Sequence, residues 1–371
     1  MKTVDVVVVG GGPAGSATAL GLARVGARVA LYESSDYDQL RMGETLPPSV
    51  NPLLRELGVW EQFTALGSLP SYQTASAWGA SLVSQRSFLF SPHGNGWHVD
   101  RARFDAMLAQ AAADAGVRVL RGVRARHIER SSGGFEIEAS EPVHASMLVE
   151  ASGRAARFGR GLGGKRAQLD RLVCAARVFL TRPSEPLGDT FLEAVASGWW
   201  YASPLPGGHR IVACFTDARN AAQDRLRTPS GWAAAVAATR HIRHLTDRCP
   251  IGEVRVISAA SHQLRPCAGP GWVAVGDAAL AVDPLSSGGV TFALRTATAA
   301  TNALMNDHHT DYLELVDNSA TEYRKLRAEI YSWELRFTCM PFWRDRSDPA
   351  EPEVRSAPDH RNLRRGRLAP T

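Results

Sequence analysis

The first 33 residues alternate apolar and turn-forming stretches in a pattern that predicts a strand, a helix and a second strand. Residues 4–9 form a continuous apolar run, typical of a strand buried on both faces. A glycine-rich turn follows at residues 10–15, then a helical stretch to Ala23 that Gly26 can end. Residues 28–33 indicate the next strand. The chain therefore begins with a βαβ unit, the building block of α/β folds.

Further along the chain, helical and strand-like patterns keep alternating. The segment at residues 69–96 is rich in serine, glycine and aromatic residues without a helical period, which favours strands and loops of an inserted sheet. Residues 171–262 alternate short β-like runs with turns, and no internal repeat is visible. The sequence predicts helices at 47–57, 100–115, 229–244, 289–305 and 311–337, a hairpin at 127–139, and strands at 117–120, 147–151 and 272–275.

Composition and charge narrow the class of protein. The 371 residues are 44% apolar and 21% charged, which is globular, and 42 basic against 37 acidic residues leave a formal charge of +5. The basic residues are spread along the chain, so we expect no nucleic-acid partner. We also expect no membrane span and a cytoplasmic location, because neither a long apolar run nor a signal peptide is visible. Five widely spaced cysteines without a C-x-x-C pair favour a reducing compartment and predict no metal site.

The turn after the first strand carries a dinucleotide-binding pattern. Residues 10–15 read G-G-G-P-A-G and fit G-x-G-x-x-G between a strand and a helix. Gly10 permits the tight turn, Gly12 lets a pyrophosphate approach the backbone, and Gly15 packs the helix against the strand. Pro13 and Ala14 open the helix, whose N-terminus supplies N–H donors. The unit can hold either NAD or FAD.

An acidic residue completes the pattern. Glu33 lies at the end of the second strand, 18 residues after Gly15, where its carboxylate can accept from ribose hydroxyls. A carboxylate there would repel a 2′-phosphate, so NADP is not expected in this turn.

Four further segments resemble the FAD-dependent monooxygenase and halogenase superfamily, which has the para-hydroxybenzoate hydroxylase fold. Residues 41–48 read R-M-G-E-T-L-P-P and look like the G-E-[ST] segment that lies along the isoalloxazine ring in the halogenase branch. The resemblance implies that Arg41 and Thr45 lie beside FAD and that Glu44 lines the substrate cavity. Residues 99–105 resemble the D-R-x-x-F-D helix start, in which Arg101 approaches the flavin.

The remaining two segments follow strands. Residues 148–154 match the D-A-[ST]-G-R version of the halogenase and geranylgeranyl-reductase branches, with Glu150 in place of the usual aspartate. This departure from the A-D-G version puts direct use of NAD(P)H in doubt. Residues 272–289 resemble the G-D-A-A-x(5)-P fingerprint. By that resemblance the cofactor-binding residues are Gly276, Asp277, which binds the ribityl chain, and Pro284, Gly288 and Gly289, ahead of a helix whose N-terminus faces the flavin.

The resemblance implies a discontinuous arrangement of domains. We expect a Rossmann-like FAD-binding domain with an inserted β-sheet substrate domain and a C-terminal helix. The FAD-binding domain is predicted at residues 1–70, 98–160 and 265–305, and the substrate domain at 71–97 and 161–264. A helical segment at 306–346 and a flexible basic tail at 347–371 complete the chain.

Aromatic patterns point to one subgroup of this superfamily. Residues 198–206 read G-W-W-Y-A-S-P-L-P, and residues 331–346 end in P-F-W-R-D-R. Both look like patterns of the LodB-like flavoproteins, maturation factors of quinone-cofactor amino-acid oxidases. Trp200 and Tyr201 face opposite sides if they lie on a strand, so at least one can face a substrate cavity.

The resemblance implies an enzyme that reduces FAD, forms a flavin C4a-hydroperoxide with O2 and hydroxylates an aromatic, indole-like substrate. The substrate is a tryptophan of a partner protein or a small aromatic intermediate of secondary metabolism, and the electrons come from NAD(P)H or a separate flavin reductase. Glu44, His98, Trp200 and His262 are the candidate catalytic residues lining the cavity.

Lysine usage separates hydroxylation from halogenation. Halogenases carry a lysine shortly after the G-E segment, whereas this chain has only Lys2, Lys165 and Lys325, and the matching stretch carries Asn51. The halogenase W-x-W-x-I-P pattern is also absent, so halogenation is the less favoured alternative. An FAD-dependent reductase of the geranylgeranyl-reductase type, and a non-enzymatic flavin-binding module or assembly chaperone that docks through residues 361–367, remain open.

Overall fold

The predicted βαβ unit forms the centre of a parallel sheet. The computed structural model describes residues 2–181, 189–247, 249–306 and 308–347. Strand β1 (Lys2–Val9) is followed by helix α1 (Pro13–Arg24) and strand β2 (Val29–Tyr32). β1 pairs in parallel with β2 on one side and with β11 (Val143–Glu150) on the other. The predicted βαβ unit is therefore confirmed.

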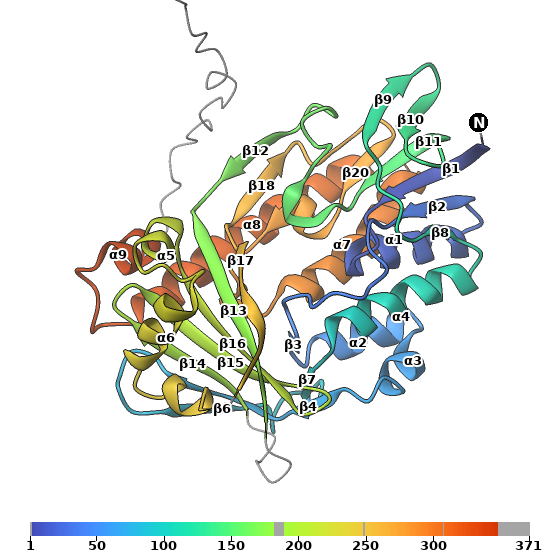
Figure 1. Cartoon of the computed structure of the whole chain (residues 1–371). Coiled ribbons are helices and arrows are strands. Elements are labelled where there is room, and N and C mark those ends of the chain that lie inside the picture. The colour runs from blue at the N-terminus through green and yellow to red at the C-terminus, as the bar shows by residue number, and fades with distance from the viewer. Residues whose placement is uncertain (1, 182–188, 248, 307, 348–371) are drawn as a thin grey trace, which may run out of the picture.

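Four neighbouring strands end at the same edge of this eight-stranded sheet (Figure 1). Val9 lies opposite Glu150 and Tyr32, and Glu150 lies opposite Ala274. Because the carboxyl ends of parallel strands form the ligand-binding edge of such sheets, the turns that follow them come together there. The fourth of these strands is β20 (Trp272–Ala274). The other four strands of the sheet are β8 (Arg118–Leu120), β9 (His127–Ser131), β10 (Gly134–Glu138) and β19 (Ala268–Gly269), with β9 and β10 forming the predicted hairpin.

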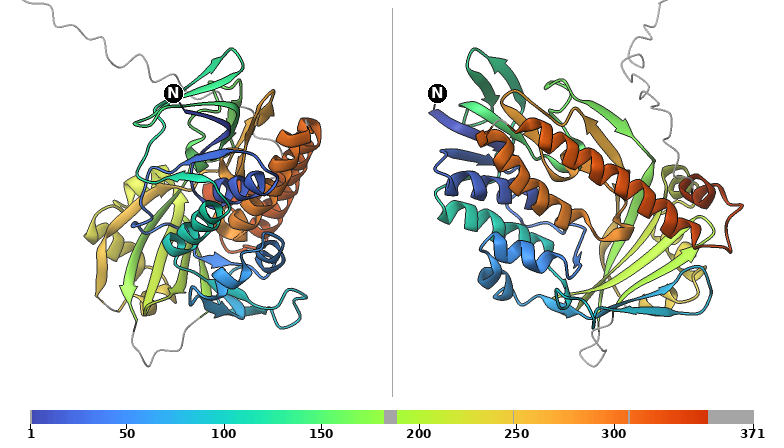
Figure 2. Two further views of the ribbon diagram at one scale, coloured as in Figure 1. Left: turned by 90° about the vertical axis from the view of Figure 1, so that its right-hand side faces the viewer. Right: turned by 180° about the vertical axis from the view of Figure 1, so that it is seen from behind.

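Helices cover this sheet on the side that α1 occupies. α1 packs between α4 (Arg101–Asp114) and α7 (Gly289–Asn306), and α7 runs beside α8 (His309–Ser332), as Figure 2 shows from behind. Asp100 caps α4, because its carboxylate accepts from the backbone N–H groups of Ala102 and Arg103. Two short helices, α2 (Val50–Glu56) and α3 (Trp60–Thr64), complete this layer.

A second, seven-stranded sheet lies beside the first and has one apolar cluster on each face (Figure 1). One cluster joins it to α8 and to α9 (Pro341–Ser347), and the other joins it to α5 (Ala218–Gln223) and α6 (Pro229–Ala237). Its strands, in spatial order, are β17 (Pro250–Ser258), β13 (Leu172–Leu180), β16 (His209–Asp217), β15 (Gly198–Leu205), β14 (Thr190–Val195), β5 (Gln73–Ala77) and β6 (Ser84–Ser87).

Two small sheets connect the larger ones. One contains β3 (Thr45–Leu46), β7 (Gly96–His98) and β4 (Leu69–Ser71), and the other contains β12 (Lys165–Gln168), β18 (His262–Arg265) and β21 (Leu280–Ala281). The predicted strands at residues 69–96 are therefore divided between two sheets. β5 and β6 extend the seven-stranded sheet, whereas β4 and β7 pair with the segment that carries Thr45.

Two predicted helices end earlier than expected. The helix at 229–244 stops at Ala237, because the buried carboxylate of Glu193 accepts from the N–H groups of Arg240, His241 and Ile242 and fixes a different backbone there. The helix at 311–337 stops at Ser332. The predicted basic tail lies almost entirely outside the described residues.

Removing the Glu193 carboxylate should destabilise the fold. Glu193→Ala leaves three backbone donors without their acceptor, that of Ile242 being buried, and we expect a loss of about 3 kcal/mol in the free energy of unfolding. Chemical denaturation measures this loss, and Glu253→Ala, at an exposed position of β17, is the matched control. Equal stability of the two variants would contradict the assigned role of Glu193.

Candidate functional site

The turn after β1 leaves no room for side chains except at one position. Gly10 has φ +114°, and a Cβ on it would lie 2.1 Å from the carbonyl oxygen of Ala151. A Cβ on Gly15 would lie 1.9 Å from the carbonyl oxygen of Gly10. At Gly12, by contrast, no described atom lies within 4 Å of the Cβ position. The turn is thus closed against the protein and open at Gly12, where a phosphate could approach.

The second glycine motif lies directly against the first. Pro13 is the first residue of α1, and Ala14 follows it into the buried interior. Gly276 has φ +55°, and a Cβ on it would lie 2.7 Å from the Cβ of Ala14. The two motifs, distant in sequence, therefore form one surface.

Glu33 is buried and fixes the glycine turn. Its Oε2 accepts from the backbone N–H of Gly11 at 2.9 Å. Its Oε1 accepts from the Arg41 guanidinium at 3.0 Å and from the Ser35 hydroxyl at 2.7 Å. The carboxylate is thus held at the turn by three different segments.

A buried aspartate joins two of the predicted flavin-side arginines. Asp105 is inaccessible to solvent, and its carboxylate pairs with Arg41 at 2.8 Å and with the Nε of Arg101 at 3.1 Å. Arg101 also donates to the carbonyl of Met42 at 2.7 Å. Because a buried carboxylate needs paired charge, Asp105 holds the 41–45 segment against α4.

Asp277 is held by the arginine of the D-A-[ST]-G-R-like segment. Its Oδ2 lies 3.2 Å from the Nε of Arg154, whose guanidinium also donates to the carbonyls of Ala259 and Val282. Glu150 of the same segment is fully buried and accepts from the backbone N–H groups of Ser152 and Phe158. Burial raises the pKa of the Glu150 carboxyl.

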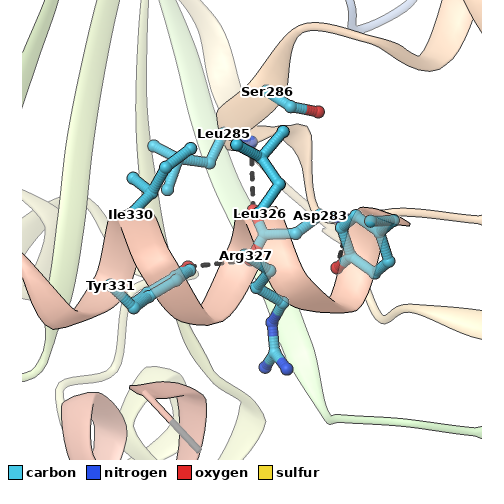
Figure 3. A pocket seen from close by; sticks show the side chains of 8 residues that line it. Asp283, Leu285, Ser286, Leu326, Arg327, Ile330 and Tyr331 are labelled. Carbon is cyan, nitrogen blue, oxygen red and sulfur yellow. Dashed lines mark hydrogen bonds between the residues drawn. The ribbon is translucent and has the colours of Figure 1, made fainter. Parts of the chain in front are cut away.

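The turn ahead of α7 is tied to α8. Pro284 begins a short 3-10 turn, and Ser287 has a left-handed backbone with φ +49° before Gly288 and Gly289. Figure 3 shows the pocket beneath this turn, where the Tyr331 hydroxyl donates to the buried Asp283 carboxylate at 2.7 Å. No described atom lies within 4 Å of a Cβ on Gly289, so the start of α7 faces open space.

A buried cluster of hydroxyl groups surrounds Thr45, and we call it the Thr45 cluster. Its members come from four strands: Thr45 from β3, His98 from β7, Thr190 from β14, and Tyr201 and Ser203 from β15. The Thr45 Oγ1 lies 2.6 Å from the Tyr201 hydroxyl, 3.1 Å from the Ser203 Oγ, 3.2 Å from the Thr190 Oγ1 and 3.3 Å from the His98 Nδ1. The cluster links the 41–45 segment to the seven-stranded sheet.

Glu44 and His98 differ in their electrostatics within this region. The Glu44 carboxylate is buried and accepts from the N–H of Gly43 at 2.9 Å. Burial and the Glu44 charge raise the pKa of Tyr201. Burial lowers the pKa of His98 to about 4, so its imidazole is neutral at physiological pH.

Two predicted catalytic residues lie elsewhere. Trp200 points to the opposite face of β15, where its ring packs against Trp232 with centroids 5.1 Å apart in the core beneath α6. His262 is buried on β18, where its Nδ1 lies 3.1 Å from the Arg166 guanidinium. Burial and Arg166 lower its pKa to about 3. The side chains of Trp200 and His262 therefore lie away from the Thr45 cluster, and only Glu44 and His98 of the four candidates come together.

Two members of the cluster, Thr190 and Ser203, were not predicted from the sequence, and Tyr201 was recognised only as the alternative to Trp200 for the cavity-facing position. Tyr201 and Ser203 lie two residues apart on β15 and therefore face the same side, opposite to Trp200. That alternation was visible, but the strand pairing that brings Thr190 beside them was not. Polar residues at alternate positions of an otherwise apolar strand were the available signal.

The polar groups at this edge of the sheet fit an FAD molecule. The open position at Gly12, the carboxylate of Glu33, the partly exposed Asp277 and the open start of α7 lie on segments that meet at one edge of the parallel sheet. A dinucleotide needs N–H groups for its phosphates and acceptors for its ribose, and these residues supply both. Among the described residues, no helix is long and apolar enough to cross a membrane.

Comparison with known proteins identifies the family. The model of the FAD binding domain family matches residues 3–311. The putative FAD-dependent oxidoreductase LodB of Marinomonas mediterranea is 31% identical over 360 residues, which cover 93% of this chain and 97% of LodB.

Solved structures agree on the fold. The flavin-dependent halogenase CmlS has a TM-score of 0.81 at 24% identity, over 93% of this chain and 68% of that chain. The peptidyl tryptophan dihydroxylase QhpG, essential for tryptophylquinone cofactor biogenesis, has a TM-score of 0.77 at 25% identity, over 96% of this chain and 82% of that chain. The predicted para-hydroxybenzoate hydroxylase-like fold is confirmed, and the chain belongs to the FAD-binding family of flavin-dependent monooxygenases and halogenases as an FAD-dependent oxidoreductase.

Proposed function

We propose that this enzyme is a flavin-dependent monooxygenase that hydroxylates an aromatic, indole-like substrate. The substrate is a tryptophan side chain of a partner protein or a small aromatic intermediate of secondary metabolism. The likeness to LodB, over nearly the whole of both chains, and to QhpG, a peptidyl tryptophan dihydroxylase, supports this choice.

The proposal assigns FAD to the edge where the strands of the parallel sheet end. The pyrophosphate would lie at the backbone N–H of Gly12, Pro13 being unable to donate, with Gly10, Ala14 and Gly15 forming the rest of the turn. The remaining assigned positions share the same edge of the sheet: Glu33 on the adenosine ribose, Asp277 with Gly276 on the ribityl chain, and Arg41, Thr45, Arg101, Pro284, Gly288 and Gly289 around the flavin. Bound FAD supplies the redox chemistry, and O2 is the second substrate.

The observation that carries the proposal is that Asn51 occupies the position where halogenases have a lysine. Asn51 is buried, and its Nδ2 donates to the carbonyls of His93 and Asn95 at 2.8 and 2.9 Å. Its Oδ1 accepts from the Trp97 indole N–H at 2.8 Å. The amide is fully used in holding the 93–97 segment, so this position has a structural role and offers no amine to a halogenating species.

Two further observations agree with oxygenation. The Thr45 cluster provides buried, polar, uncharged groups beside the 41–45 segment, an environment that can orient a substrate and exclude bulk water. Lys165 and Lys325 are exposed on β12 and α8, away from the buried Glu44 segment.

The electron donor is NAD(P)H or a separate flavin reductase, and the D-A-[ST]-G-R-like segment supports the second. Glu150, which replaces the usual aspartate, is fully buried and bonded to backbone N–H groups of its own turn. Its carboxylate therefore has a structural role in the turn after β11.

The FAD assignment predicts a specific effect of filling the open position. Gly12→Ala places a methyl group where the phosphate would lie, without a clash in the protein itself, because Gly12 has φ −71° and an open Cβ position. We expect FAD affinity to fall on the order of tenfold or more, with unchanged thermal stability of the FAD-free protein. Gly161→Ala, on an exposed turn, is the matched control. Isothermal titration with FAD measures both, and equal affinities would refute the assignment.

Isotopic oxygen tests the reaction itself. The FAD-loaded enzyme, supplied with a flavin reductase, NADH and labelled O2, should transfer label into a tryptophan-containing peptide or an indole compound, as read by mass spectrometry. Chloride or bromide added to the same mixture should not appear in the product. Halogen incorporation would favour the halogenase alternative, and reduction of an alkene without O2 uptake would favour the reductase alternative.

A further inference from the structure

Basic side chains crowd the chain just after the turn that follows β11. Residues 154–166, which we call the basic segment, contain five basic residues and no acidic one. Arg157, Arg160 and Lys165 among them are exposed. We propose that the basic segment is the surface that attracts FAD from solution and guides it into its site. This inference goes beyond the proposed function and rests only on the assignment of FAD to the edge of the parallel sheet.

Most of the positive charge of the basic segment has no acidic partner. Among the described residues, its ion pairs are limited to that of Arg154 with Asp277. The Arg166 guanidinium lies 3.1 Å from the Nδ1 of His262, whose lowered pKa of about 3 keeps the imidazole neutral at physiological pH. Burial and the nearby charges of Arg160 and Arg154 lower the pKa of Arg166. The charge of the segment therefore remains available to an anion from outside the chain.

The arrangement of the two short strands adds to this crowding. Lys165 on β12 lies directly opposite Arg265 on β18 in an antiparallel pair (Figure 1). Like charges directly opposite each other destabilise a sheet. Arg265 has a partner in Asp317 at 3.5 Å, but both side chains are about half exposed, so solvent screens their attraction. An anion close to this surface would relieve the repulsion.

The basic segment begins where the cofactor turns meet. A Cβ on Gly10 would lie 2.1 Å from the carbonyl oxygen of Ala151, so the turn after β11 touches the first glycine turn. The Nε of Arg154 lies 3.2 Å from the Oδ2 of Asp277, whose side chain is 29% exposed. From there the segment continues through exposed positions to β12. It therefore leads from the surface to the edge at which FAD is assigned.

The charge of FAD makes it a suitable ligand for such a surface. Its pyrophosphate is ionised at physiological pH, so the whole molecule is an anion. A basic surface beside a binding site raises the local concentration of an anionic ligand and speeds its association by roughly 10- to 1000-fold, an effect that weakens as salt is added. Charges at the rim of a site act mainly on the rate of association and little on the rate of dissociation.

The same surface favours FAD that arrives already reduced. Reduced flavin carries a further negative charge on its ring, so its attraction to the basic segment is stronger than that of oxidised FAD. A separate flavin reductase releases FAD in this form, and this step alone rests on the electron donor of the proposed function.

Stopped-flow mixing of the FAD-free protein with oxidised FAD, followed by flavin fluorescence, tests the proposal without turnover. The triple variant Arg157→Gln, Arg160→Gln and Lys165→Gln should associate with FAD on the order of tenfold more slowly than wild type at low salt. Its dissociation rate should be unchanged. The two association rates should converge near 1 M salt, where the Debye length is about 3 Å. The thermal stability of the FAD-free variant should not fall, because the substitutions remove like charges from exposed positions.

A variant with the same loss of charge elsewhere is the matched control. Arg86→Gln, Arg219→Gln and Arg227→Gln remove exposed arginines from β6, from α5 and from the turn after α5. These positions belong to the seven-stranded sheet and the helix beside it, so the control should keep most of the wild-type association rate. Equal slowing of both variants would overturn the proposal. It would also be overturned if FAD left the basic-segment variant faster while its association rate was unchanged.

These measurements are independent of the oxygenation reaction. They use FAD without an aromatic substrate, so a failure of the proposed hydroxylation leaves their outcome unaffected. Anaerobic mixing with reduced FAD should show a larger slowing in the basic-segment variant than oxidised FAD shows. A smaller slowing would contradict the delivery of reduced FAD across this surface, although the capture of oxidised FAD would stand.

Discussion

The structure depends on a point where three segments of backbone meet without room for a side chain. The first segment carries Gly10, directly after β1, and Gly15, on α1. The second is the backbone at Ala151, and the third carries Gly276, from the far part of the chain. A methyl group on any of these glycines would overlap neighbouring atoms, and overpacking of this kind costs roughly 1–3 kcal/mol. This close approach brings together the turns that can hold the two ends of a dinucleotide.

Buried ion pairs hold the residues around these glycines in place. Asp105 lies fully buried between Arg41 and Arg101, and Glu33 binds both Arg41 and the glycine turn. Removing one member would leave buried charge unpaired, which is far more costly than losing an exposed ion pair. The same ion pairs position the segment that ends in Glu44 and Thr45. One network of contacts therefore places both the glycine turn and the Thr45 cluster.

Much of this arrangement could be predicted from the sequence, because it depends on local signals. The glycine patterns, the Asp100 cap and the first strand–helix–strand unit follow from residues close in the chain. Trp200 could not be placed correctly, because its role depends on which face of β15 packs against α6. The Thr45 cluster needs four strands from separate parts of the chain, and Arg166 beside His262 follows only from the pairing of β12 with β18.

A crystal structure of the FAD-bound enzyme tests the central claim most directly. The account predicts the pyrophosphate at Gly12 and the start of α1, and the flavin ring between the 41–45 segment and the start of α7. It also predicts that the Thr45 cluster faces the substrate side of that ring. A flavin ring bound away from the 41–45 segment, or separated from the Thr45 cluster by another element of the fold, would contradict it.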